Sequence, residues 1–194
     1  MAARIRRGEP PKGKLNNKNY RRRALPALLR DFERRCAYSL RHEQQAGGLT
    51  HMEVDHFNPT LPNRSRNRYS NLFLSTRHCN LKKRAYWPLP ADQKKGIRFL
   101  NCCEEIDYGV HLFEKPDTHE LVGLTPAGRY HIIACDLNAD HLVTERRERS
   151  LLRNLLNGTV AIVKPTANLA SLRTNLKLLK SIVDRMIPPI PYFG

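Results

Sequence analysis

Residues 54–88 read VDHFNPTLPNRSRNRYSNLFLSTRHCNLKKRAYWP, and this stretch decides the fold. The segment LTHMEVDHF that leads into it alternates and is rich in strand formers, which predicts a strand ending near His56. A polar, arginine-rich loop follows, and NLFLS then predicts a second short strand from Asn71. Residues 78–86 are compatible with a helix that Trp87-Pro88 ends. The expected order is strand, loop, strand and helix.

Lysine and arginine are concentrated in the first half of the chain. Residues 1–43 hold 13 Lys and Arg against 4 Asp and Glu, residues 44–100 hold 10 against 3, and residues 101–194 hold 11 against 11. The net charge of +16 therefore lies in the first hundred residues. Such one-sided charge attracts a polyanion, and nucleic acid is the commonest polyanion available. The alternative is a generic basic protein whose charge serves solubility.

The chain divides into three expected parts. Residues 1–20 are basic with few apolar side chains, which predicts a flexible arm that binds phosphates. Residues 21–100 form the predicted core, beginning with an amphipathic helix over 21–35. Residues 101–194 form an extension packed on that core.

Composition also bears on the compartment. No apolar run approaches the roughly 20 residues that a membrane span requires, and no secretory signal is readable at the N-terminus. Five cysteines without regular spacing do not describe a disulfide framework. We expect a soluble, cytoplasmic protein.

The C-terminal half has its own pattern of elements. VHLFEKP and ELVGLT predict a β-hairpin, and RYHIIACDL predicts a further strand that contains Cys135. Residues 140–157 and 167–187 carry leucines at helical spacing, which predicts two amphipathic helices. These helices pack on the fold or include a docking face for a partner or a second copy, formed by Leu169, Leu172, Leu176, Leu179, Val183 and Met186. The fold class is α+β.

Three short motifs in the core resemble one known family. They are the DH pair at Asp55 and His56, the Asn71 that opens the second strand, and a CNxxK element containing Asn80 and Lys83. Their order resembles the HNH endonucleases, whose catalytic unit is a ββα-metal fold, over about 50 residues from Cys36. The last of the three named residues is often His in the family, and the Asn here corresponds to an HNN-type variant.

The chemistry of phosphodiester hydrolysis fits these residue types. The reaction needs a base for water and a cation to neutralise charge on the phosphate oxygens. His56 is the candidate base, because neutral imidazole accepts a proton near neutral pH. Asp55 and Asn80 are candidate ligands for Mg²⁺ or Mn²⁺, which take oxygen donors. The resemblance implies that Asn71 braces the loop and orients His56.

Two conditions qualify this site. Adjacent strand residues point to opposite sides, so Asp55 and His56 share one site only if the strand ends or bends at Asn58-Pro59. Each residue also has an ordinary structural alternative, since Asp-His pairs are often solvated and Asn residues often cap turns. Flanking phosphates are the expected partners of Arg64, Arg66, Arg68, Lys82, Lys83 and Arg84.

Cys36 and Cys79 stand where many HNH proteins carry two CxxC pairs for a structural zinc. One cysteine of each pair is missing, which excludes a Cys₄ site. A Cys₂His₂ set with His42 and His78 is conceivable, but two buried thiols packed together are favoured over zinc. Cys102, Cys103 and Cys135 receive no role.

The sequence thus predicts a metal-dependent HNH endonuclease that cleaves DNA with little sequence preference. The resemblance implies a place in bacterial antiviral defence, with an ATPase or another defence protein as partner, and a homodimer is left open. One alternative is a non-catalytic nucleic-acid binding module on the same scaffold. Another is an RNA-binding or ribosome-associated protein, although Tyr69, Tyr86 and Trp87 are its only stacking candidates near the basic segment.

Overall fold

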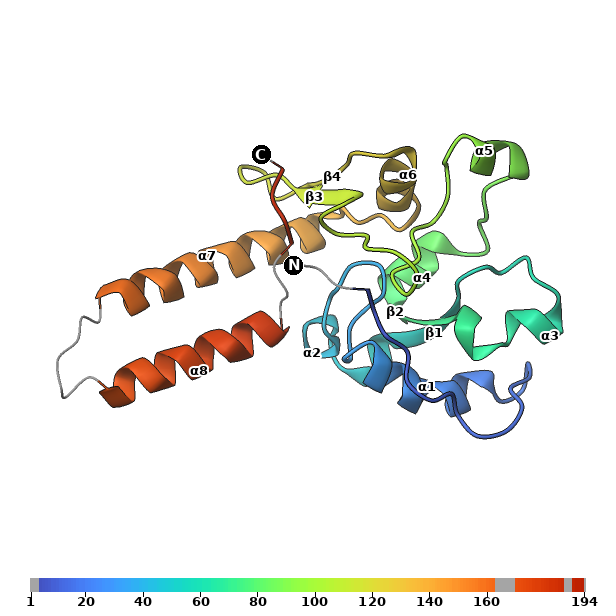
Figure 1. Ribbon diagram of the computed structural model, residues 1–194, viewed down its shortest axis with the longest axis horizontal. Helices are drawn as coiled ribbons and strands as arrows, with labels where there is room; N and C mark the ends of the chain where they lie inside the picture. The colour runs from blue at the N-terminus through green and yellow to red at the C-terminus, as the bar shows by residue number, and fades with distance from the viewer. Residues whose placement is uncertain (1–3, 163–169, 187–189, 194) are drawn as a thin grey trace.

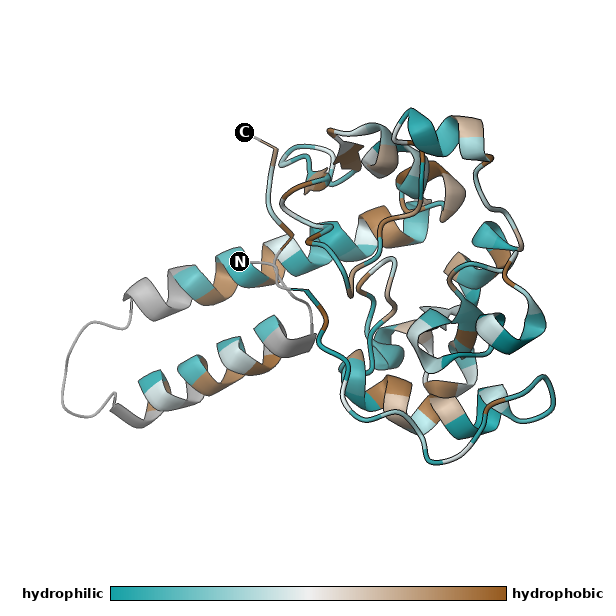
Figure 2. Ribbon diagram, turned by 45° about the vertical axis from the view of Figure 1, so that its right-hand side comes forward, coloured by the Kyte–Doolittle hydropathy of each residue, from teal (hydrophilic) through white to brown (hydrophobic). Residues whose placement is uncertain are grey.

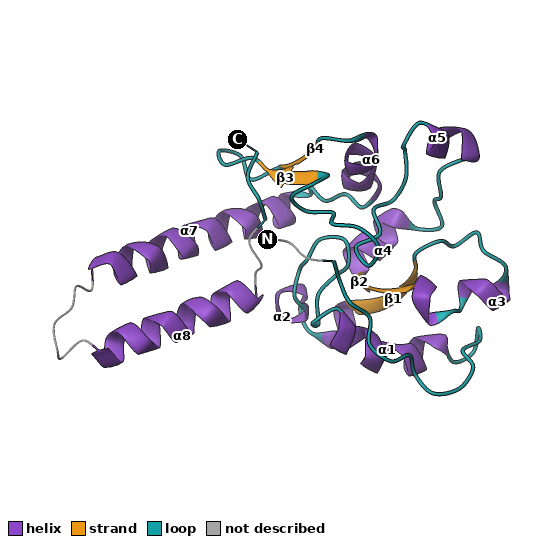
Figure 3. Ribbon diagram, in the orientation of Figure 1, coloured by secondary structure: helices purple, strands orange, loops and turns teal. Residues whose placement is uncertain are grey.

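A computed structural model describes residues 4–162, 170–186 and 190–193, and it has mixed α+β architecture, as predicted (Figure 1). Two small antiparallel sheets lie among helices and loops (Figure 3). In the first sheet, β1 (Met52–His56) pairs with β2 (Leu72–Thr76). In the second, β3 (Leu112–Glu114) pairs with β4 (Leu121–Gly123), which confirms the predicted hairpin.

The strand, loop, strand and helix order around the DH pair is confirmed. Helix α4 (Arg77–Lys83) follows β2 directly, and Thr76 caps it by accepting a hydrogen bond from the Cys79 backbone N–H. Every residue of β2 is buried, because α1 and α4 both contact this small sheet. Several short helices were not predicted: α2 (Glu43–Ala46), α3 (Asn63–Arg66), α5 (Pro90–Lys94) and the 3₁₀ turns Leu49–His51 and Tyr69–Asn71.

The first helix packs against the β1–β2 sheet. Helix α1 (Tyr20–Asp31) buries Ala24 and Leu28, and its Pro26 lies on the exposed side. The predicted helix extended to residue 35. It ends earlier, because Glu33 and Arg34 adopt positive φ angles that a helix does not allow.

Residues 4–19 lie along the body of the protein. The Arg7 guanidinium sits 4.8 Å from the centre of the Phe73 ring and donates to the backbone carbonyls of Tyr69 and Leu72 at 3.0 and 2.9 Å. This cation–π contact and its hydrogen bonds hold the segment, and Ile5 and Leu15 add aliphatic packing against the core. Composition predicted a flexible arm over residues 1–20 and did not indicate this anchor.

The predicted strand RYHIIACDL is wrong, since these residues form helix α6 (Pro126–Ala134) and its C-cap Cys135. The start signals are local: the Thr125 side chain accepts from the Gly128 backbone N–H at 3.0 Å, and Pro126 occupies the first helical turn. β-branched residues had suggested a strand. A Cβ on Gly128 would lie 2.4 Å from the His111 carbonyl oxygen, so glycine lets α6 touch the hairpin.

Helices α7 (Asp140–Ile162) and α8 (Ala170–Met186) confirm the two predicted C-terminal helices. They lie side by side as a hairpin that extends from the body, and hydrophobic residues occur along both (Figures 1 and 2). Of the predicted docking face, Leu172 and Leu179 are exposed and Leu176 is half-buried. Leu169 and the side chains of Val183 and Met186 lie outside the described residues.

The core and the extension share one set of buried side chains. A single hydrophobic cluster runs from Ala24 in α1 to Ile190 near the C-terminus. The Tyr108 hydroxyl donates to the Tyr38 carbonyl oxygen at 2.7 Å, which joins residues 101–194 to the segment before β1. Among the described residues, no helix has the length and apolar character needed to cross a membrane.

A buried ionic network fixes α7 on the second hairpin. Glu114 of β3 has no exposed surface, and its carboxylate accepts from Arg149 of α7 and contacts His119 Nδ1 at 2.8 Å. Arg146, one turn earlier, donates to the His119 and Leu137 carbonyl oxygens at 2.6 and 3.0 Å. These bonds satisfy charges that burial would otherwise make costly.

We predict that Arg149→Met lowers the free energy of unfolding by about 3 kcal/mol, because it leaves the Glu114 carboxylate buried without its guanidinium. Urea denaturation measures the change. Arg147→Met, on the exposed side of the same helix, is the matched control and should change stability by less than about 0.5 kcal/mol. Equal stabilities for the two variants would contradict this role of Arg149.

Candidate functional site

His56 is the last residue of β1 and is half-buried. Its Nε2 lies 3.0 Å from Asn67 Oδ1, and its ring packs on Tyr20 with the ring centres 4.6 Å apart. Burial lowers the pKa of His56 from its usual value, and the Asn67 contact acts in the opposite direction. The imidazole is therefore neutral at neutral pH, which is the form that accepts a proton.

Asn67 is the site residue that sequence reasoning missed. It is buried, and its amide nitrogen donates to the Asn63 carbonyl oxygen at 3.0 Å and to Asn17 Oδ1 at 2.6 Å. Asn17 belongs to the N-terminal segment, so this segment is linked to the His56 imidazole through the side chain of Asn67. The sequence carries no signal for Asn67, because a single asparagine among the arginines of a polar loop follows no regular spacing.

Asn71 holds the loop between β1 and β2. Its Oδ1 accepts from the Asn58 backbone N–H at 2.9 Å, and its Nδ2 donates to the Asn58 and Arg66 carbonyl oxygens, both at 3.0 Å. These three bonds give Asn71 the bracing geometry that was expected. The side-chain contact that orients His56 comes from Asn67.

Asp55 lies in a buried polar cluster. Its Oδ2 accepts from the Tyr38 hydroxyl at 2.5 Å and lies 3.0 Å from Lys83 Nζ. Burial raises the pKa of the Asp55 carboxyl, and the Lys83 ammonium opposes that rise. Lys83 also donates to the His56 carbonyl oxygen at 2.9 Å, so one ammonium contacts both residues of the DH pair.

The position of Lys83 corrects its predicted role as a phosphate contact. Lys83 has no exposed surface, although it is the last residue of a short surface helix. It turns inward because the buried Asp55 carboxylate provides its partner. Lys82 and Arg84, its neighbours in the chain, are exposed.

Strand β1 ends at His56, and residues 57–60 form a bend and a turn, which is the strand end that a shared site for Asp55 and His56 requires. One more hydrogen bond follows the strand, from the Phe57 N–H to the Asn71 carbonyl oxygen at 2.8 Å. The side chains of the DH pair nevertheless have different partners: Asp55 contacts Lys83 of α4, whereas His56 contacts Tyr20 of α1.

Asn80 and Glu53 add oxygen donors on the α4 side of β1. The Asn80 amide donates to Glu53, which is two residues before Asp55 and on the same side of the strand. Because side chains alternate between the two faces of a strand, the sequence of β1 already places Glu53 on the same face as Asp55. Two carboxylates and a carboxamide fit, in kind, the ligands that Mg²⁺ or Mn²⁺ takes. No three His, Cys, Asp or Glu side chains converge on a metal position within residues 4–162, 170–186 and 190–193.

Cys36 and Cys79 are fully buried beside one another. The contact with the Cys36 thiol raises the pKa of Cys79, and burial raises it further. Thr76 donates to Cys36 Sγ at 3.6 Å. The two candidate histidines lie elsewhere: His42 Nδ1 accepts from a backbone N–H at the start of α2, and His78 contacts the Asp136 carbonyl oxygen. The four side chains do not come together.

The predicted phosphate contacts other than Lys83 lie on two surface segments. Arg64 and Arg68 are exposed and Arg66 is half-buried in and beside α3. Lys82 forms an ion pair with Asp136 at 2.8 Å, which uses part of its charge. One segment lies between β1 and β2 in the chain, and the other follows β2 directly.

Comparison of the chain with protein-family models, curated proteins and solved structures finds no match.

We predict that His56 titrates below the usual histidine pKa of about 6.5. Because Tyr20 covers the imidazole, Tyr20→Ala should admit water and raise the pKa of His56 toward the usual value. Two-dimensional NMR of the histidine ring protons against pH measures both. The ring signals of His51, which is exposed just before β1, serve as the internal reference in both proteins. A His56 pKa above 6.5 in the wild type would contradict this electrostatic description.

Proposed function

We propose that this chain is a metal-dependent endonuclease of the HNH type that hydrolyses phosphodiester bonds in DNA. The observation that carries the proposal is the neutral, half-buried His56 at the end of a two-stranded sheet followed by a short helix. The proposal also draws on the positive charge of the first hundred residues, since DNA is a polyanion.

In this mechanism His56 takes the proton from the attacking water. If Nε2–H donates to Asn67, the other ring nitrogen, Nδ1, is left with a lone pair for that proton. Asn71 keeps the loop that carries Asn67 in place. Asp55 and Asn80 would hold the metal ion, with Glu53 as a neighbouring donor. A hard divalent ion supplies charge neutralisation at the phosphate oxygens.

Substrate binding in this proposal is electrostatic. Arg64, Arg68, Lys82 and Arg84 are exposed cations that would hold backbone phosphates. Phosphate contacts carry no sequence information by themselves, so we infer little sequence preference. The GRYHI element at residues 128–132 resembles that of small HNH proteins of bacterial defence, and from this resemblance we infer a role in antiviral defence, with an ATPase or another defence protein as the regulating partner.

A second candidate is a nucleic-acid binding module without catalysis. It is favoured by the contacts at the proposed metal ligands: Lys83 already compensates the Asp55 carboxylate, and the Asn80 amide donates to Glu53. A protein that never holds a metal could keep this arrangement permanently. Metal-dependent cleavage separates the two candidates.

We predict that the wild type nicks or linearises supercoiled plasmid with Mg²⁺ or Mn²⁺ and that EDTA stops the reaction. His56→Ala should slow cleavage by about 10²–10⁴-fold, since it removes the proton acceptor, while DNA binding is unchanged. His51→Ala is the matched control, because it removes an exposed histidine five residues earlier. Cleavage by His56→Ala at the wild-type rate would rule out the mechanism, and binding without cleavage by all three proteins would favour the binding module.

We also predict a steep salt dependence of DNA affinity. Replacing both Arg64 and Arg68 by alanine should reduce the slope of log affinity against log salt by about 2, about one for each lost phosphate contact. Replacing Arg147 and Lys177, exposed cations on α7 and α8, removes the same charge at a different place and should leave the slope nearly unchanged. Fluorescence anisotropy of a labelled duplex measures the slopes. Equal effects of the two double variants would favour a diffuse charge effect over these contacts.

A further inference from the structure

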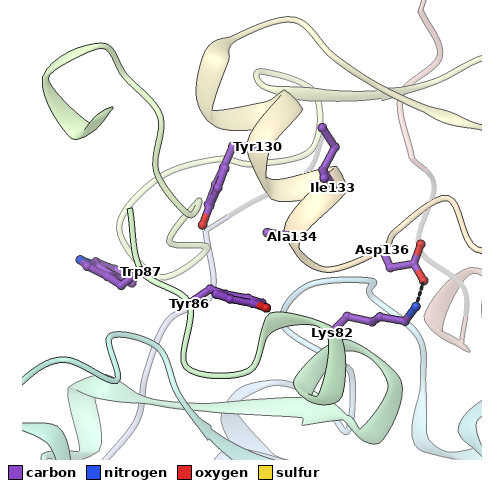
Figure 4. A pocket seen from close by; sticks show the side chains of 7 residues that line it. All are labelled: Lys82, Tyr86, Trp87, Tyr130, Ile133, Ala134 and Asp136. Carbon is purple, nitrogen blue, oxygen red and sulfur yellow. Dashed lines mark ion pairs between the residues drawn. The ribbon is translucent and has the colours of Figure 1, made fainter. Parts of the chain in front are cut away.

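A cavity of about 510 Å³ lies between the end of α4 and helix α6 (Figure 4). Residues from distant parts of the chain form its walls, and they share a predominance of rings and apolar groups: Lys82, Tyr86, Trp87, Tyr130, Ile133, Ala134 and Asp136. The volume is within the roughly 300–1,000 Å³ of small-molecule sites. Sequence reasoning had noted two of these rings and not the third, Tyr130, which lies more than forty residues further along the chain.

Phe99, behind the cavity, holds two of the aromatic rings that line it. The Trp87 ring stacks on Phe99 at 5.8 Å between centres, and Tyr130 meets the edge of the same Phe99 at 5.0 Å. The open side is different: Tyr86 is 57% exposed and Ile133 is 79% exposed. Rigid rings behind exposed apolar groups form a surface suited to a flat apolar ligand.

Polar groups around the cavity indicate the chemistry of that ligand. Lys82 and Arg84 present exposed cations on the segment that carries Tyr86, which suits a ligand attached to phosphate. The Asp136 carboxylate closes one end in its ion pair with Lys82, where it could also accept from an amino group. A nucleobase on a phosphate chain combines a flat ring, polar edges and adjacent negative charge.

The cavity is also connected to the candidate site. Trp87 packs edge-on against Phe57, the residue directly after His56, with 5.5 Å between ring centres. Lys83 donates to the His56 carbonyl oxygen. In the chain, Lys83 lies between Lys82 and Tyr86, which both line the cavity. A strand held at β1 therefore has a cavity within reach of one of its neighbouring nucleotides.

We propose that this cavity binds one unstacked nucleobase of the nucleic-acid substrate, between Tyr86 and the fixed rings of Trp87 and Tyr130. The inference rests on the proposed nucleic-acid binding and narrows the substrate to strands with an unpaired or extruded base. A base that leaves the stack pays a few kcal/mol less when it is already unpaired, so single-stranded or distorted sites are preferred.

The test uses Trp87, which is the only tryptophan in the chain, as the reporter. The full-length protein is titrated in EDTA with a short single-stranded oligonucleotide and with an abasic strand of equal length and charge. Binding of each strand is followed separately by anisotropy of a terminal label. We expect the base-bearing strand to quench Trp87 fluorescence and to bind at least about fivefold more tightly than the abasic strand, the lower end for one stacked base.

Variants of the exposed ring complete the test. Tyr86→Ala should lose that same fivefold or more in affinity for the base-bearing strand and nothing for the abasic strand, whereas Tyr86→Phe should retain the affinity. Tyr192→Ala, which removes a similarly exposed ring on the C-terminal segment, is the control. Equal binding of both strands without quenching would overturn the cavity proposal and leave nucleic-acid binding standing. No binding of either strand while a labelled duplex is still bound would overturn the cavity proposal alone, and no binding of the strands or the duplex would overturn both.

Discussion

The buried contact between Asp55 and Lys83 is the constraint on which the rest of the structure depends. It joins β1 to α4 with both charges removed from water, so each group needs its full set of partners. Tyr38 supplies one of these partners, and the carbonyl oxygen of Tyr38 in turn accepts from Tyr108 of the extension. The same ammonium holds the backbone of His56. A shift of α4 relative to β1 would leave the buried charge of Asp55 or Lys83 without its partner. This cost fixes the positions of the sheet, the helix and the extension relative to one another.

Local patterns in the sequence predicted the elements whose signals are local. Alternation placed β1, the short run NLFLS placed β2, two strand-like segments placed the β3–β4 hairpin, and leucine spacing placed α7 and α8. The predicted strand over residues 129–137 was wrong, because β-branched composition outweighed a Thr-Pro helix start. The inward turn of Lys83 and the anchoring of Arg7 could not be predicted, since each depends on a partner brought near only by the complete fold.

The candidate site divides in the same way. The DH pair, Asn71 and Asn80 were predicted from order and spacing, and all of them lie in or beside the β1–β2 sheet. Asn67 was not found, because its contact with His56 depends on the path of the loop. Glu53 was within reach of simple strand alternation. A site built across two faces of one strand depends more on backbone geometry than on motif spacing, and the DH pair illustrates this dependence.

Glu114 contacts both α7 and the C-terminal segment, and these contacts constrain the path of the chain between them. Its side chain holds α7 through Arg149, while its backbone N–H donates to the Pro191 carbonyl oxygen and its carbonyl oxygen accepts from the Phe193 N–H. The long excursion through α7 and α8 thus begins and ends at one residue of β3. The excursion is a closed handle, so a cut in the chain between its two helices would leave both segments attached to the body.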